Sequence, residues 1–199
     1  MIDAANQEPR SPHLADWIRL ALHTGCRKGE LLGLEWGRVD LHQRVIHLEA
    51  RHNKSKRRQT IPLNEEARNA ILSRARFRAQ YCPSTPWVFS DKAGQRIKDI
   101  KKGFASACRR AGITDFRPHD LRHTCASWLV MRNVPLATVK AVLRHGSIVV
   151  TERYAHLAPE SARGALALLD APGVKPASES KTAITSRYRH VGSAAAEKE

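Results

Sequence analysis

Long apolar runs are missing from this sequence of 199 residues. None approaches the roughly 20 residues that a helix needs to cross a bilayer, so we expect no transmembrane helix and no membrane partner. The residues after Met1 read Ile-Asp-Ala-Ala-Asn-Gln, without the basic start or the apolar stretch of a secretion signal. The sequence therefore predicts a cytoplasmic protein.

Cysteine is scarce, and Cys26, Cys82, Cys108 and Cys125 lie far apart. Neither the paired spacing of a zinc site nor the dense pattern of a disulfide scaffold is present, so we expect reduced thiols that are mostly buried. Clustered carboxylates, the usual ligands of a catalytic Mg²⁺ or Ca²⁺ ion, are missing too. We therefore expect no metal and no other cofactor.

Acidic residues are also few, with 19 Asp and Glu against 34 Lys and Arg, a formal net charge of +15. The last 28 residues, 172–199, hold five basic and three acidic residues, so the excess lies in the body of the chain (29 − 16 = +13). A surplus of this size favours a polyanionic partner such as nucleic acid.

The hydrophobic pattern predicts a mainly helical α+β domain with a small antiparallel sheet. Residues 12–23 have apolar positions at a helical period, and two β-prone runs, 44–49 and 59–63, enclose a polar, basic loop typical of a hairpin. Asn64 is a predicted helix cap, and a short strand is expected at 87–89. Further helices are expected at 28–34, 98–111, 118–132, 135–144 and 159–169. We expect one domain over residues 1–171 and a flexible tail over 172–199.

Three segments contain the residues that metal-free cleavage of a phosphodiester would need. Such a reaction requires a nucleophile, cationic groups on the non-bridging oxygens and an acid for the leaving oxygen. Arginine matches phosphate oxygens two at a time, tyrosine can act covalently, and lysine or histidine can deliver a proton.

The first segment, TGCRKGELL at 24–32, places Arg27 after a helix-ending glycine, with Glu30 spaced to hold a guanidinium. The second, PHDLRHT at 118–124, places His119 and Arg122 at the start of a helix, where amide groups favour an anion. A surface ion pair and a structural histidine are the ordinary alternatives for these two segments.

The third segment, LRHGSIVVTERYAHL at 143–157, places His145 nine residues before Tyr154. Of the other tyrosines, Tyr188 lies in the predicted tail and Tyr81 has no histidine near it. A tyrosine alone is more often a packing residue than a nucleophile. The hairpin loop RHNKSKRR at 51–58 adds five cations, most of which we expect to contact DNA phosphates.

Together these segments resemble the tyrosine recombinase (phage integrase) family in order and separation, over residues 12–170. The resemblance implies that Tyr154 is the nucleophile, that Lys54 in the hairpin is the proton donor, and that Glu30 supports Arg27. The phosphate would be held by Arg27, His119, Arg122 and His145, and DNA would also contact Arg51, Lys56, Arg57, Arg58 and Arg144.

The implied activity is that of a site-specific recombinase or integrase, which cleaves and rejoins double-stranded DNA through a 3′-phosphotyrosyl link without metal or ATP. A homotetramer on DNA is implied as well. The sequence departs from the family at Arg144, where glycine is usual, and the separate N-terminal DNA-clamping domain is expected to be absent.

Other functions remain open at this stage. One is a non-catalytic DNA-binding remnant of an integrase, and another is a relaxing activity like that of a type IB topoisomerase. A third is a zinc metallohydrolase, because His119 and His123 lie four residues apart as helical zinc ligands do. The last leaves Arg27, Lys54 and Tyr154 without roles.

Overall fold

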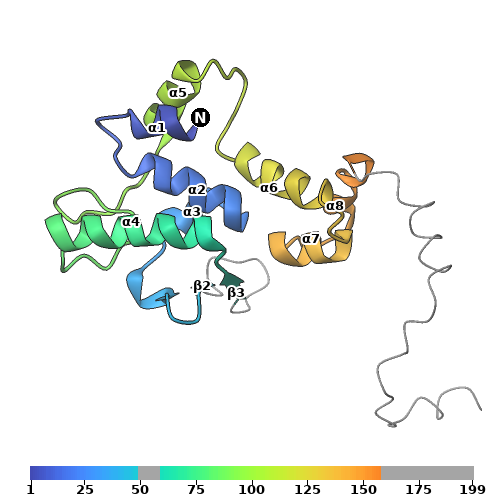
Figure 1. Ribbon diagram of the computed structural model, residues 1–199, viewed down its shortest axis with the longest axis horizontal. Helices are drawn as coiled ribbons and strands as arrows, with labels where there is room; N and C mark the ends of the chain where they lie inside the picture. The colour runs from blue at the N-terminus through green and yellow to red at the C-terminus, as the bar shows by residue number, and fades with distance from the viewer. Residues whose placement is uncertain (49–58, 158–199) are drawn as a thin grey trace, which may run out of the picture. The chain divides into compact units, whose positions relative to one another are not determined.

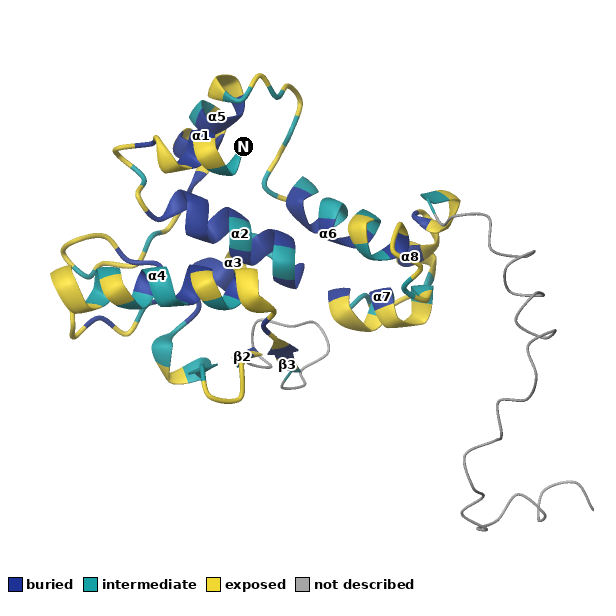
Figure 2. Ribbon diagram, viewed as in Figure 1, coloured by how far each residue is buried: buried dark blue, intermediate teal, exposed yellow. Residues whose placement is uncertain are grey.

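The computed structural model describes residues 1–48 and 59–157. Helix α2 (Leu14–Thr24) lies at the centre of the larger hydrophobic core and contacts α1 (Ile2–Asn6), α4 (Glu65–Tyr81) and α6 (Asp120–Val130). Its side chains Trp17, Ile18 and Leu20 are fully buried. Figure 2 shows α2 dark blue along most of its length, whereas α4 is yellow over much of its surface. The apolar period at 12–23 thus correctly predicted a helix.

The predicted hairpin is confirmed, and it belongs to a three-stranded antiparallel sheet of order β1-β2-β3. Strands β2 (Val45–Leu48) and β3 (Gln59–Pro62) pair Ile46 with Ile61, which are both buried, and His47 with Thr60 on the exposed face. This alternation is what a sheet with one face on the core requires. Strand β1 (Val39–Asp40) was not expected from the sequence.

Asn64 caps α4 as predicted, because its side-chain oxygen accepts a hydrogen bond of 3.0 Å from the backbone N–H of Ala67. The short strand expected at 87–89 is wrong. Among the residues that the structure describes, residues 87–90 make only isolated bridges, Glu35 with Trp87 and Ser90 with Arg96. Its apolar residues Val88 and Phe89 are buried in the core instead, which explains their β-like composition.

Helices α5 (Lys101–Arg110), α6 and α7 (Leu136–Leu143) follow the expected order (Figure 1). Pro118 lies in a turn before α6 rather than in its first position, and Pro135 is the N-cap of α7. A short α8 (Val149–Glu152) and the 3-10 turn Ala155–Leu157 were not expected. They place Tyr154 in a second hydrophobic cluster with Cys125, Val130, Val139 and Leu143, among others.

The fold class is therefore confirmed as mainly helical α+β with a small antiparallel sheet. Within residues 1–48 and 59–157, no helix is both long and apolar enough to cross a bilayer. The helix expected at 159–169 and the tail expected at 172–199 lie outside the described residues, so both stay predictions.

Candidate active site

A pocket of about 860 Å³ brings together the predicted phosphate-holding groups and the predicted nucleophile. Arg27 comes from the start of α3 (Lys28–Leu32), His119 and Arg122 from the start of α6, and His145 from the turn after α7. Tyr154 follows α8. The remaining lining residues are His123, Gly146, Ser147, Val150 and Arg153. Residues that are up to 127 positions apart in the sequence thus line the same pocket.

Arg122 is held by the main chain. Its guanidinium donates hydrogen bonds to the carbonyl oxygens of Gly25 and Leu143, and only 4% of the residue is exposed. Burial and the charges of Arg27 and Arg144 lower the pKa of Arg122 to about 10, so it remains a cation at neutral pH. Since arginine has five N–H donors, N–H groups remain for a ligand in the pocket.

Glu30 joins Arg27 to Arg144. Its Oε1 accepts a hydrogen bond of 2.9 Å from Arg27 Nη1, and its Oε2 accepts one of 2.9 Å from Arg144 Nη2. Oε2 also accepts the backbone N–H of Arg27 at 2.7 Å. The contact that the spacing of Arg27 and Glu30 predicted is therefore present, with a second arginine that the spacing did not predict.

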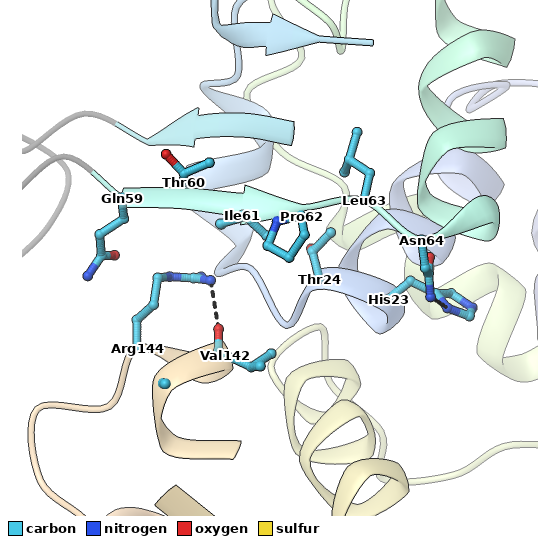
Figure 3. A pocket seen from close by; sticks show the side chains of 11 residues that line it. His23, Thr24, Gln59, Thr60, Ile61, Pro62, Leu63, Asn64, Val142 and Arg144 are labelled. Atoms are coloured by element: carbon cyan, nitrogen blue, oxygen red, sulfur yellow. Dashed lines mark hydrogen bonds between the residues drawn. The ribbon is translucent and has the colours of Figure 1, made fainter. Parts of the chain in front are cut away.

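Arg144 has a side chain that is only 5% exposed. In a neighbouring pocket of about 620 Å³ between α7 and β3, Nη1 donates to the carbonyl oxygen of Val142 at 3.0 Å (Figure 3). An enclosed guanidinium that pairs with a buried carboxylate has little surface left for a phosphate. We therefore favour an internal role for Arg144 over the expected contact with DNA.

His145 is tied to the helix that precedes Tyr154. Its Nδ1 and the hydroxyl of the buried Thr151 share a hydrogen bond of 2.9 Å. Burial, with the charges of Arg122 and Arg27, lowers the pKa of His145 to about 4. The imidazole is therefore neutral at neutral pH, and it lines the pocket.

Tyr154 is 6% exposed, and its hydroxyl forms a hydrogen bond with Nδ1 of His123. Burial raises the pKa of Tyr154, although the charges of Arg153 and Arg122 oppose this effect. Since the ordinary value is already about 10, the phenol is protonated at neutral pH and needs a base before it can attack.

Two ionisable pocket residues, His123 and Arg153, had not been assigned a role in phosphate chemistry. His123 had been considered only as a zinc ligand. Among the described residues, no group of three or more His, Cys, Asp or Glu side chains could hold a metal ion. The signal that could have revealed both residues is their position directly beside Arg122 and Tyr154 in the sequence.

The hairpin cations cannot be compared with their predicted roles. Arg51, Lys54, Lys56, Arg57 and Arg58 lie outside the described residues, which resume at Gln59 in β3. The proton donor and these DNA contacts stay predictions.

Comparison with known proteins gives a consistent result. The model of the phage integrase family matches residues 1–161. The integrase of Salmonella phage P22 is 34% identical over 166 residues, which cover 77% of this chain and 40% of that protein. The tyrosine recombinase XerC of Azotobacter vinelandii is 30% identical over 144 residues, 70% of this chain and 46% of XerC.

Solved structures agree with the fold. The catalytic domain of bacteriophage HP1 integrase superposes with a TM-score of 0.63 at 27% identity, over 86% of this chain and 92% of that domain. The chain thus spans less than half the length of the curated relatives above, but it matches nearly all of an isolated catalytic domain.

Proposed function

Since the chain belongs to the phage integrase family, we propose that it cleaves and rejoins DNA strands as a site-specific recombinase or integrase. The observation that carries this proposal is the convergence of Tyr154, Arg27 and Arg122 on one pocket. A phenol beside two guanidinium groups suits attack on a phosphodiester, because the cations stabilise the charge that spreads over the non-bridging oxygens.

In the proposed reaction, the oxygen of Tyr154 attacks a phosphorus atom of the DNA backbone. A 3′-phosphotyrosyl bond forms while the bond to the 5′ oxygen breaks, and Lys54 protonates that oxygen. Arg27, Arg122, His119 and His145 bind the phosphate. Because one phosphate ester replaces another, a second DNA 5′-hydroxyl can reverse the step, and neither ATP nor a metal is required.

The proposed partner is double-stranded DNA, and the proposed assembly is a homotetramer on two duplexes. A net charge of +15 supports a polyanionic partner. Sedimentation of the chain with and without duplex DNA tests the assembly, since a tetramer that forms only with DNA is the expected result.

Covalent capture tests the reaction itself. The 199-residue chain is incubated with a pool of nicked duplexes of randomised sequence, in which cleavage releases a short strand and traps the protein. An adduct that resists SDS is expected, and sequencing the captured DNA identifies the preferred site. Tyr154→Phe should abolish the adduct, whereas Tyr81→Phe, a change at a half-exposed tyrosine outside the pocket, should retain it.

The same assay separates the DNA-binding remnant and the metallohydrolase from the proposed enzyme. If the chain binds DNA but forms no adduct, the result supports the non-catalytic DNA-binding remnant. Loss of the adduct in EDTA would point to a metal-dependent enzyme, whereas the proposed reaction is unaffected by a chelator. An adduct that persists in Tyr154→Phe would refute the assignment of the nucleophile.

A further inference from the structure

The contact between His123 and Tyr154 is not explained by the roles proposed so far. His123 lies one helical turn after His119 in α6, and its Nδ1 is hydrogen-bonded to the Tyr154 hydroxyl. The two ring centroids are 5.9 Å apart, with the planes inclined at 44°. The resemblance assigned His119, not His123, to the phosphate, so this second histidine needs its own account.

The protonation state of His123 follows from the groups around it. His119 packs edge to face on His123, with 4.9 Å between centroids, and Asp120 and Arg122 are neighbours on the same helix. His145, which follows α7, and Arg153, which follows α8, also lie near His123.

Burial and the nearby cations lower the pKa of His123, although Asp120 opposes them, so the ring is neutral at neutral pH. A neutral imidazole that carries its proton on Nε2 accepts at Nδ1. In that tautomer the phenol of Tyr154 is the donor.

The other histidines of the pocket are engaged differently. His145 directs its Nδ1 to Thr151, and His119 lies against the ring of His123 rather than at the phenol. Arg27, Arg122 and Arg153 are cations and cannot accept a proton. The nucleophile therefore lies beside a neutral base within hydrogen-bonding distance, which is the geometry that general-base catalysis requires.

We propose that His123 is the general base that activates Tyr154; this inference rests on the proposed strand-cleavage function. As the Tyr154 oxygen forms its bond to phosphorus, its proton moves to Nδ1 of His123. The bond between phosphorus and the 5′ oxygen breaks, and Lys54 donates a proton to that oxygen. In the reverse step, a 5′-hydroxyl returns its proton to Lys54, and imidazolium His123 returns the proton to the departing phenol.

His123→Asn is the most informative variant, because asparagine retains an acceptor near the position of Nδ1 but cannot take up a proton. We expect the single-turnover rate of adduct formation to fall by about 10²–10⁴-fold, with DNA binding unchanged. The matched control is His156→Asn, a change at an exposed histidine two residues after Tyr154 and outside the pocket, which should leave the rate unchanged.

Two further measurements distinguish a base from a structural contact. In His123→Ala, added imidazole should restore part of the rate, since it supplies a base to the vacated space. In the intact chain, the rate should rise with pH and level off once His123 is neutral. In His123→Asn it should continue to rise toward the pKa of Tyr154.

The outcomes separate this inference from the function on which it rests. If the intact chain forms no adduct, the proposed function fails. If it forms the adduct and both His123→Asn and His123→Ala keep the rate and pH profile of the intact chain, His123 is not the base and the function stands. If either variant is unstable, a pH profile without a levelling limb in the intact chain overturns the inference by itself.

Discussion

Glu30 and Arg144 lie 114 positions apart in the chain and form a buried ion pair, with 2.9 Å between Oε2 and Nη2. The same carboxylate binds Arg27, so one acidic side chain joins the start of α3 to the end of α7. His145 follows Arg144 directly. The ion pair therefore positions Arg27 and His145, two of the residues that are proposed to bind the phosphate.

Arg144→Ala should reduce both stability and the rate of adduct formation. It leaves Glu30 with Arg27 as its remaining guanidinium partner, which we expect to lower the free energy of unfolding by about 1–3 kcal/mol. Arg144 has a left-handed backbone (φ 59°, ψ 42°), so Arg144→Gly should lose about 1 kcal/mol less than Arg144→Ala. Urea denaturation and single-turnover capture measure both effects. Wild-type rates in both variants would show that the pair does not position the site.

Gly25→Ala should destabilise the protein by about 2–4 kcal/mol. Gly25 has a φ of +59°, and a Cβ added there would lie 2.5 Å from Cδ2 of the buried Leu143. Its carbonyl also accepts a hydrogen bond from Arg122, so the adduct rate should fall too.

Gly29→Ala is the matched control for that change, because a Cβ at Gly29 meets no atom within 4 Å. As Gly29 lies inside α3, alanine should raise stability by about 0.5–1 kcal/mol. Thermal melts of the two variants measure the contrast. Equal stability would mean that the Gly25 turn adapts to a side chain.

Stability should fall in mild acid because of His13. His13 is 6% exposed, and its Nε2 is buried without a hydrogen-bond partner in the described part of the chain. Burial, with the charge of Arg74, lowers the pKa of His13 to about 4 from about 6.5 in the unfolded chain. As the pH falls, His13 therefore takes up a proton in the unfolded state before it does so in the folded state. The contribution of His13 to the free energy of unfolding is full above pH 6.5 and is lost as the pH falls toward 4.

His13 alone should contribute a loss of about 3 kcal/mol across this range. Asp16, whose pKa is raised by burial, opposes the effect, so the measurement is a difference between variants. Urea denaturation at pH 7.5 and 4.5 should show a shallower pH dependence in His13→Gln than in the intact chain. Identical slopes would refute the assignment.

Lys54→Ala should slow cleavage of ordinary DNA by about 100-fold, because the 5′ oxygen then leaves without its proton donor. A substrate with sulfur in place of that bridging oxygen should restore the rate, since a thiolate leaves without being protonated. The same substrate should not restore His123→Asn, whose defect lies at the nucleophile. If sulfur fails to restore Lys54→Ala, the proton donor lies elsewhere.

The sequence predicted those parts of the fold that depend on local pattern. The apolar period around Trp17, the alternation around Ile46 and Ile61, and the cap at Asn64 are each set by neighbours within a few positions. Val88 and Phe89 were misassigned because a buried connecting segment has the composition of a strand. Similarly, the apolar side chain of Trp128 in α6 is 38% exposed, because burial depends on which elements pack against the helix.

The site was predictable to the extent that its residues lie in recognisable segments. The contact of Arg27 with Glu30 follows from a three-residue spacing. The enclosure of Arg144 does not, because no local pattern reveals whether a cation faces solvent or a carboxylate 114 positions away. The hydrogen bond between His123 and Tyr154 was not predictable either, because it depends on how the chain returns from α8 to α6.

The anchoring of Arg122 by two carbonyl oxygens affects how this site tolerates sequence change. Main-chain acceptors are present whatever side chain a position has, so mutation at residues 25 or 143 can displace them but cannot delete them. Divergent sequences can therefore vary the packing around this guanidinium and still orient it, provided that the two backbone segments keep their separation.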